Sequence, residues 1–120
     1  MSSTLMFVCS DAEKYGMLAQ PMQDAGFDTE MVDPGATTVL ETIETAAPMA
    51  TVFDLATGPE QAMQEIAKAM LADPNLPRPL LVFVGGDADT VATIKGDIPF
   101  AVFVNPDELT WVLKHLVYKD

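Results

Sequence analysis

Leu80-Leu81-Val82-Phe83-Val84, followed directly by Gly85-Gly86, is the stretch of this sequence that decides its fold. Five apolar residues in a row are typical of a strand that is covered on both faces, as strands in parallel sheets are. The two glycines after the run indicate a turn at the end of the strand. The stretch therefore predicts a parallel sheet with helices on both sides.

Three further apolar runs have the same character, at residues 5–9, 51–53 and 100–104. Residues 29–32 instead alternate polar and apolar side chains, which is typical of a strand at the edge of a sheet. Five strands are therefore expected, with this segment at an edge.

Apolar residues between these runs recur with the period of a helix. The two clearest stripes are Val39, Leu40, Ile43, Ala46 and Ala47, and Met63, Ile66, Ala67, Met70 and Leu71. A first helix is expected at about residues 11–25, although it contains Gly16 and Pro21, and a short fourth helix near residues 89–95. Strand and helix alternate five times, which predicts one three-layer α/β/α domain over residues 1–120 with right-handed crossovers.

Two helix starts can be predicted from local sequence. Thr57-Gly58-Pro59-Glu60 has the pattern of a capping box with proline in the first turn. Asn105-Pro106-Asp107-Glu108 combines a capping side chain, a proline and two acids at the positive end of the helix dipole.

Charge and cysteine content restrict the functions that the chain can have. Six Lys and Arg face 18 Asp and Glu, a formal net charge of −12, which disfavours binding to nucleic acids and to anionic membranes. A basic protein partner fits this charge better, although the charge also serves solubility alone. The single cysteine allows no internal disulfide, and residues 1–6 have no basic region of a signal peptide, so a cytoplasmic location is expected.

In an open α/β sheet, ligands bind beyond the carboxyl ends of the strands. Asp54 closes a buried apolar run there, where a carboxylate must be solvated, paired or bound to a cation. The alternative is that Asp54 only accepts backbone hydrogen bonds at a strand end. Cys9, at the end of the first run, is predicted to be a small buried hydrophobe, because the acidic chain offers few cations to stabilise a thiolate.

Several segments together resemble the CheY-like receiver domains of response regulators over nearly the whole chain. They are Ala25-Gly26-Phe27, the step of 28 residues from Gly26 to Asp54, Val52-Phe53-Asp54-Leu55, Asn105-Pro106 and Asp107-Glu108-Leu109. The resemblance implies a flavodoxin/CheY-like sheet with strand order 2-1-3-4-5. It also implies that Asp54 is the phospho-acceptor candidate, which in receivers takes a phosphoryl group from a histidine kinase with the help of Mg²⁺.

The acidic pair that holds Mg²⁺ in receivers is changed in this chain. It aligns best with Cys9 and Ser10, whereas a shift of one residue aligns Ser10-Asp11 with it and restores one acid. Asp11 and Asp54 are therefore the candidate metal ligands, and Mg²⁺ is the cofactor implied if Asp54 is phosphorylated.

The groups that relay phosphorylation in receivers are also changed. The relay Thr or Ser aligns with Val84 or Gly85, the lysine with Asn105 and the aromatic switch with Val102. Losing one charge-stabilising group typically costs about 3–4 kcal/mol of the reaction barrier. We therefore expect a stand-alone degenerate receiver that is not an enzyme and acts in two-component signalling through protein contacts. The alternatives are a working Mg²⁺-dependent receiver phosphorylated on Asp54, and an unrelated flavodoxin-like domain with a small ligand in the crevice.

The last helix carries a candidate binding surface. Its core stripe is expected to be Leu109, Val112, Leu113 and Leu116, with Trp111, His115 and Tyr118 on the other side. Grouped exposed aromatics often anchor interfaces, which favours a protein partner such as a histidine kinase, or a second copy of the chain as a homodimer. The alternative is that Trp111 packs against a neighbouring helix.

Overall fold

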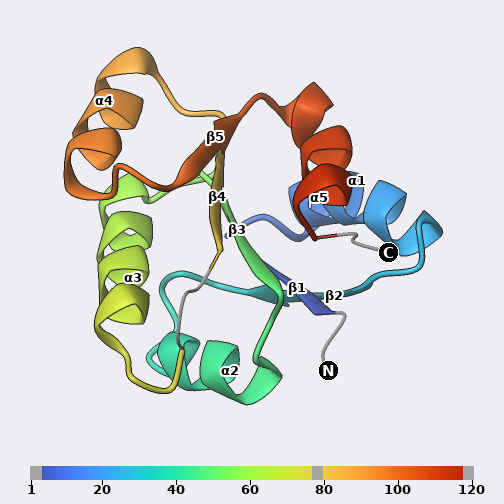
Figure 1. Ribbon diagram of the computed structural model, residues 1–120, viewed down its shortest axis with the longest axis horizontal. Coiled ribbons are helices and arrows are strands. Elements are labelled where there is room, and N and C mark those ends of the chain that lie inside the picture. The colour runs from blue at the N-terminus through green and yellow to red at the C-terminus, as the bar shows by residue number, and fades with distance from the viewer. Residues whose placement is uncertain (1–3, 77–79, 118–120) are drawn as a thin grey trace.

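Five parallel strands form the middle layer of the computed structural model, which describes residues 4–76 and 80–117 (Figure 1). The strands are β1 (Thr4–Val8), β2 (Asp28–Val32), β3 (Ala50–Asp54), β4 (Leu81–Val84) and β5 (Val102–Val104). Their order is β2-β1-β3-β4-β5, and every neighbouring pair is parallel. The predicted sheet, its order and its alternating edge strand are confirmed.

Helices cover both faces of the sheet, as predicted. They are α1 (Ala12–Asp24), α2 (Val39–Ala46), α3 (Glu60–Ala72), α4 (Ala88–Asp97) and α5 (Leu109–Val117), with a 3-10 turn at Pro106–Glu108 before α5. Helices α1 and α5 lie on one face, and α2, α3 and α4 lie on the other (Figure 1). None of the helices in the described ranges combines the length and the apolar character that a membrane crossing requires.

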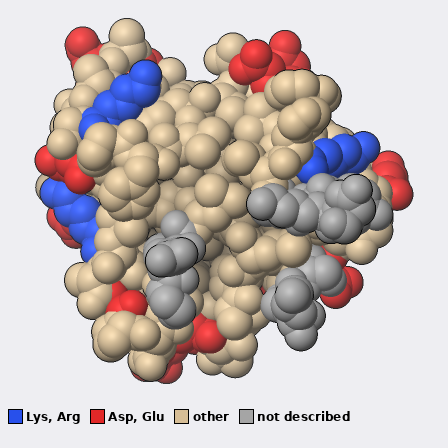
Figure 2. All heavy atoms as spheres, viewed as in Figure 1, with Lys and Arg blue, Asp and Glu red and all other residues tan. Residues whose placement is uncertain are grey.

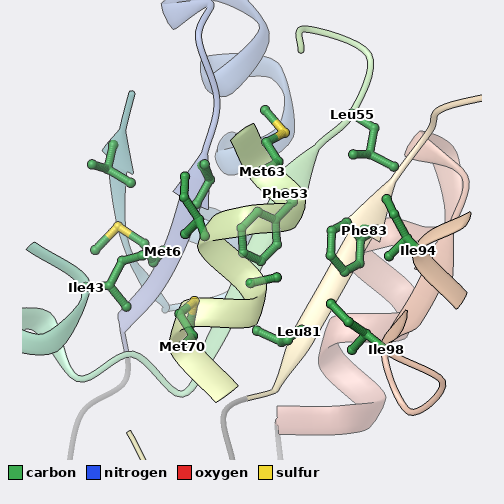
Figure 3. Close-up of a cluster of buried hydrophobic side chains, with 14 of the residues drawn as sticks. Met6, Ile43, Phe53, Leu55, Met63, Met70, Leu81, Phe83, Ile94 and Ile98 are labelled. Carbon is green, nitrogen blue, oxygen red and sulfur yellow. The ribbon is translucent and has the colours of Figure 1, made fainter. Parts of the chain in front are cut away.

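The apolar runs of β1, β3, β4 and β5 are continuous because alternate side chains enter two separate cores. Phe53 and Phe83 point to the α2–α4 face, where their rings stack with centroids 4.8 Å apart (Figure 3). Val52 and Val82, one residue earlier on the same strands, pack against α1 and α5. Both cores hold the sheet rigid beneath the strand ends that carry the candidate site.

The predicted capping box before the third helix is wrong. Helix α3 begins at Glu60 after Pro59, and no side chain caps its first turn. The hydroxyl of Thr57 instead donates a hydrogen bond to the backbone carbonyl of Asp54, at 3.0 Å. Thr57 therefore belongs to the turn that follows β3, because its nearest acceptor lies behind it in the chain and not in the helix ahead.

Three further details differ from expectation. Ala47 is exposed and ends α2 with a left-handed backbone at φ 45°, so it does not extend the apolar stripe. Helix α4 runs from Ala88 to Asp97, longer than predicted, because Asp87 caps its start and Ile94 is buried against the sheet. Leu116, expected in the core stripe of the last helix, is 37% exposed and does not belong to that stripe.

Candidate functional site

The carboxyl ends of the central strands bring the predicted site residues to one edge of the sheet. Asp54 is the last residue of β3, and Cys9 follows β1, the strand beside it. On the other side, Asp54 pairs in register with Val84 at the end of β4. Strands β1 and β3 are neighbours although β2 lies between them in the chain, and in α/β sheets such a point is where ligands bind.

Asp54 is only 1% exposed, and its carboxylate has partners within the chain. Oδ1 accepts a hydrogen bond from the backbone N–H of Ala56 at 3.2 Å, and Oδ2 lies 3.7 Å from the thiol sulfur of Cys9. The single thiol hydrogen has a second acceptor within reach, the carbonyl oxygen of Asp11 at 3.2 Å. The expected backbone hydrogen bond at the strand end is thus present, together with a side-chain donor.

Burial dominates the electrostatics of this pair. It raises the pKa of Asp54, and the positive charge of Lys14 is the largest influence in the opposite direction. Burial likewise raises the pKa of Cys9, which has no exposed surface. The thiol is therefore protonated at neutral pH, as a donor must be. The prediction that Cys9 is buried is confirmed.

Two hydroxyl side chains join the loop after β1 to the loop after β3. The hydroxyl of Ser10 lies within hydrogen-bonding distance of the carbonyl oxygens of Thr57 and Gly58, at 2.9 and 3.0 Å. The backbone N–H of Ser10 reaches the Thr57 hydroxyl at 3.4 Å. We call these contacts between Ser10 and Thr57–Gly58 the loop clasp, because they hold the two loops together beside Asp54.

The sequence analysis missed two contributors to this site, Thr57 and Lys14. Thr57 stands three residues after Asp54, a spacing that favours a turn contact, but the same residue also fits a helix cap. Lys14 stands on the first turns of α1, three residues after Asp11, and its charge acts on a carboxylate 40 positions later. The effect of Lys14 on Asp54 cannot be located before the strand order is known, whereas the Thr57 contact is local and was assigned to the helix ahead of it.

Asp11 has a structural role that its sequence position alone did not reveal. It is the N-cap of α1, and its Oδ1 accepts from the backbone N–H groups of Glu13 and Lys14, at 2.9 and 3.4 Å. Its negative charge contributes a minor upward shift to the pKa of Asp54. Asp11 is therefore within electrostatic range of Asp54, while its carboxylate is engaged by the helix terminus.

The positions that align with the relay hydroxyl and the lysine of receivers carry neither a hydroxyl group nor a positive charge. Val84 is a buried strand residue, and Gly85 has φ 75° with its N–H bonded to the carbonyl of Val104. Asn105 is exposed, and its backbone N–H donates to Glu108 Oε1 at 3.2 Å.

Asp87, which follows β4 and the two glycines, caps α4. Its carboxylate accepts a hydrogen bond from the N–H of Thr90, which lowers the pKa of Asp87.

The side chains around Asp54 do not provide the ligands that Mg²⁺ requires. The ion requires hard oxygen ligands in near-octahedral geometry, whereas one Asp54 oxygen faces a backbone N–H and the other a protonated thiol. Oδ1 of Asp11 caps a helix. Within residues 4–76 and 80–117, no group of three or more His, Cys, Asp or Glu side chains is placed to hold a metal ion.

Two of the three residues predicted to form a binding surface on the last helix, Trp111 and His115, lie within the described residues. Trp111 is 65% exposed and stacks on His115, one turn later, with ring centroids 4.3 Å apart. The structure brings these two rings together, and the alternative that Trp111 packs against a neighbouring helix is contradicted. Tyr118 lies outside the described residues. We call Trp111, His115 and the partly exposed Leu116 the α5 aromatic face.

Figure 2 shows how charged side chains are placed on one face of the molecule. On the face seen in Figure 2, acidic and basic side chains lie around the periphery, and the centre is uncharged.

No family model and no curated protein matches the sequence. Among solved structures, a response-regulator receiver domain from Bermanella marisrubri matches with a TM-score of 0.77 and 13% identity, over 99% of this chain and 100% of that chain. The chemotaxis protein CheY4 of Vibrio cholerae matches with a TM-score of 0.76 and 15% identity, over 97% and 99%.

A de novo designed Rossmann 2x3 fold protein also matches, with a TM-score of 0.70 and 12% identity, over 97% of this chain and 90% of that chain. A designed protein shares the architecture, so this similarity carries the fold and not an activity. With its strand order, its layers and its match to the solved receivers, the chain has the CheY-like fold of response-regulator receiver domains.

Proposed function

We propose that this chain is a receiver-like module of two-component signalling that acts by binding a protein partner and not by carrying a phosphoryl group. The observation that carries the proposal is the state of Asp54, which is 1% exposed with both carboxylate oxygens facing donors of the chain itself. A phospho-acceptor needs an oxygen that is free to attack, and a cation beside it to offset the charge of the phosphoryl group.

The electrostatics around Asp54 support the same conclusion. Asn105 stands where a receiver has a lysine, and neither Val84 nor Gly85 offers a hydroxyl group. The loss of one charge-stabilising group slows a reaction on the order of a hundredfold or more. With the lysine replaced and the metal ligands engaged elsewhere, phosphoryl transfer to Asp54 is expected to be very slow.

The α5 aromatic face is the proposed contact surface for the partner. Trp111 presents the largest exposed apolar side chain on α5, while Leu109 and Leu113 of the same helix are buried and hold it in place. Trp is among the residues that contribute most to interface energy. A histidine kinase or another two-component signalling protein is the proposed partner, and a basic contact surface on it would complement the net charge of −12.

Intact-mass spectrometry after incubation with acetyl phosphate and MgCl₂ tests the phosphoryl part of the proposal. In a competent receiver, an Asp54 oxygen attacks phosphorus, the bond from phosphorus to the acetate oxygen breaks, and acetate leaves. We expect no mass increase here under conditions in which a conventional receiver is phosphorylated. An adduct on the native chain that is absent from Asp54→Asn would establish the alternative, a Mg²⁺-dependent receiver phosphorylated on Asp54.

Fluorescence tests the contact surface, because Trp111 is the only tryptophan of the chain. Titration with purified histidine-kinase domains from the source organism should shift the Trp111 emission to shorter wavelength as the ring becomes buried. Trp111→Ala should weaken that binding more than tenfold, whereas Met17→Ala, which removes an exposed apolar side chain from α1, should not. Equal affinities of both variants would place the contact elsewhere on the molecule.

A further inference from the structure

We propose that Cys9 takes the place of a divalent cation beside Asp54, and that this one side chain keeps the pocket from binding Mg²⁺. The inference deepens the proposed function and rests on it, because it names the residue that makes the site independent of a metal. It starts from the mismatch between the donors present and the ligands that Mg²⁺ requires.

The position of the Cys9 side chain is set by the sheet. The backbone N–H of Cys9 donates to the carbonyl of Val32 at 3.1 Å, which continues the pairing of β1 with the edge strand. Its thiol sulfur, with no exposed surface, lies 3.7 Å from Asp54 Oδ2. A cation that bound Asp54 through Oδ2 would have to displace this sulfur or approach from the far side.

The chemistry of the thiol also excludes Mg²⁺. Sulfur is a soft ligand that Mg²⁺ does not select. The one thiol hydrogen is shared between Oδ2 of Asp54 at 3.7 Å and the carbonyl oxygen of Asp11 at 3.2 Å, and its contact with Oδ2 offsets part of the cost of burying the carboxylate without adding charge. The Thr57 hydroxyl lies 3.8 Å from the same sulfur, so the thiol also contacts a residue of the loop clasp.

A carboxylate at position 9 would reverse this arrangement. Cys9→Asp would place a third carboxyl group next to Asp54 and Asp11, giving hard oxygen donors on three residues. Without a cation the like charges repel one another, so the variant should be destabilised and should depend on a divalent ion. The exchange of one side chain is thus predicted to convert a metal-independent pocket into a cation site.

Thermal unfolding of the full chain in MgCl₂, compared with NaCl of matched ionic strength, tests the inference. We expect no Mg²⁺-specific change in the Tm of the native chain, and a rise of about 3–6 °C for Cys9→Asp. The double variant Cys9→Asp/Asp54→Asn is the matched control and should lose the rise. A Mg²⁺-specific rise in the native chain that disappears in Asp54→Asn would overturn the inference, as would a folded Cys9→Asp that does not respond to Mg²⁺.

A measurement on the native chain keeps the test decisive if Cys9→Asp does not fold. Mn²⁺ broadens the NMR signals of nuclei near its binding site. The amide signals of residues 9–11 and 54–57 should broaden equally in the native chain and in Asp54→Asn, and stronger broadening in the native chain would overturn the inference. The outcome is separable from the acetyl phosphate experiment, because a pocket can bind the ion and still fail to accept a phosphoryl group.

Discussion

The pocket around Asp54 and the α5 aromatic face differ in how their side chains are satisfied. In the pocket, the carboxylate faces a backbone N–H and a thiol, and the loops beside it are joined by the loop clasp. On α5, Trp111 is 65% exposed and its ring stacks on His115 of the same helix. The polar groups of the pocket are therefore contacted by other groups of the chain, whereas the large apolar side chain of α5 is exposed to solvent.

This difference shows where the molecule can gain free energy from another molecule. A buried polar group that already has its hydrogen bonds gains little from a ligand, because any new contact must replace an existing one. An exposed aromatic ring gains the hydrophobic free energy of its burial when a partner covers it. Binding is therefore expected at α5, and the strand ends serve mainly to hold the sheet together.

The largest expected effect separates the two sides of α5. Leu113 is fully buried between α5 and the sheet, so Leu113→Ala should lower the free energy of unfolding by about 2–5 kcal/mol. Trp111→Ala, two residues earlier on the exposed side, should change it by no more than about 0.5 kcal/mol. Urea unfolding of both variants measures the contrast, and a large loss in Trp111→Ala would show that its ring supports the fold.

Asp54→Asn should raise the free energy of unfolding by about 1–2 kcal/mol at neutral pH, because a buried carboxylate costs more than a buried amide. Burial raises the pKa of Asp54 above its value in the unfolded chain, so the folded chain binds the proton more tightly. Stability of the native chain should therefore fall as the pH rises through the window between those two pKa values. Urea unfolding across that range should show a smaller fall in Asp54→Asn, and an unchanged pH profile would contradict the role of burial.

Cys9→Ala should cost about 1 kcal/mol, because it leaves Oδ2 of Asp54 without its side-chain donor. The cost should be smaller when Asp54 is already Asn, which gives a coupling free energy of about 0.5–1 kcal/mol in a double-mutant cycle. Four unfolding curves under one condition measure it. Strictly additive changes would mean that the thiol serves only the carbonyl of Asp11.

The smallest expected effect lies away from both regions, at Glu44 on α2. Asp73 Oδ2 is buried and has no hydrogen-bond partner among the described residues. Interaction with Asp73, which favours a protonated Glu44 as hydrogen-bond donor, is the main cause that raises the pKa of Glu44. Protonated Glu44 can donate to that oxygen, so this contribution to stability is lost as the pH rises through the raised pKa of Glu44. Glu44→Gln should remove that part of the pH dependence, and the matched variant Glu13→Gln on α1 should not.

This last variant also sharpens the Asp54 measurement. Both carboxyl groups make the native chain lose stability in the same direction as the pH rises, so their contributions overlap in one unfolding profile. The pH dependence of stability should therefore be compared between Glu44→Gln and the double variant Glu44→Gln/Asp54→Asn. The part that is present in the first and absent from the second comes from Asp54. If nothing remains in Glu44→Gln, the assignment of a raised pKa to Asp54 fails.

Much of the fold could be predicted because its signals are local. The apolar runs of β1, β3, β4 and β5 are continuous since each strand is covered on both faces. The alternation of β2 agrees with its place at the edge, although β5, at the other edge, is apolar throughout. The position of Asp54 at the end of β3 was predicted from the same pattern. Local signals failed at Thr57, whose hydroxyl suits a helix cap and a turn equally well, and at Ala47, where only the backbone shows that α2 has ended.

By itself, the sequence determined the layered α/β fold, the acidic surface, the buried carboxylate of Asp54 and the aromatic spacing on the last helix. Only the tertiary structure decided what surrounds that carboxylate. Cys9 and Asp54 are 45 residues apart, and Ser10 meets Thr57 across 47. Contacts at such separations form only after the sheet places β1 beside β3, because the chain between them contributes no local preference for the pairing.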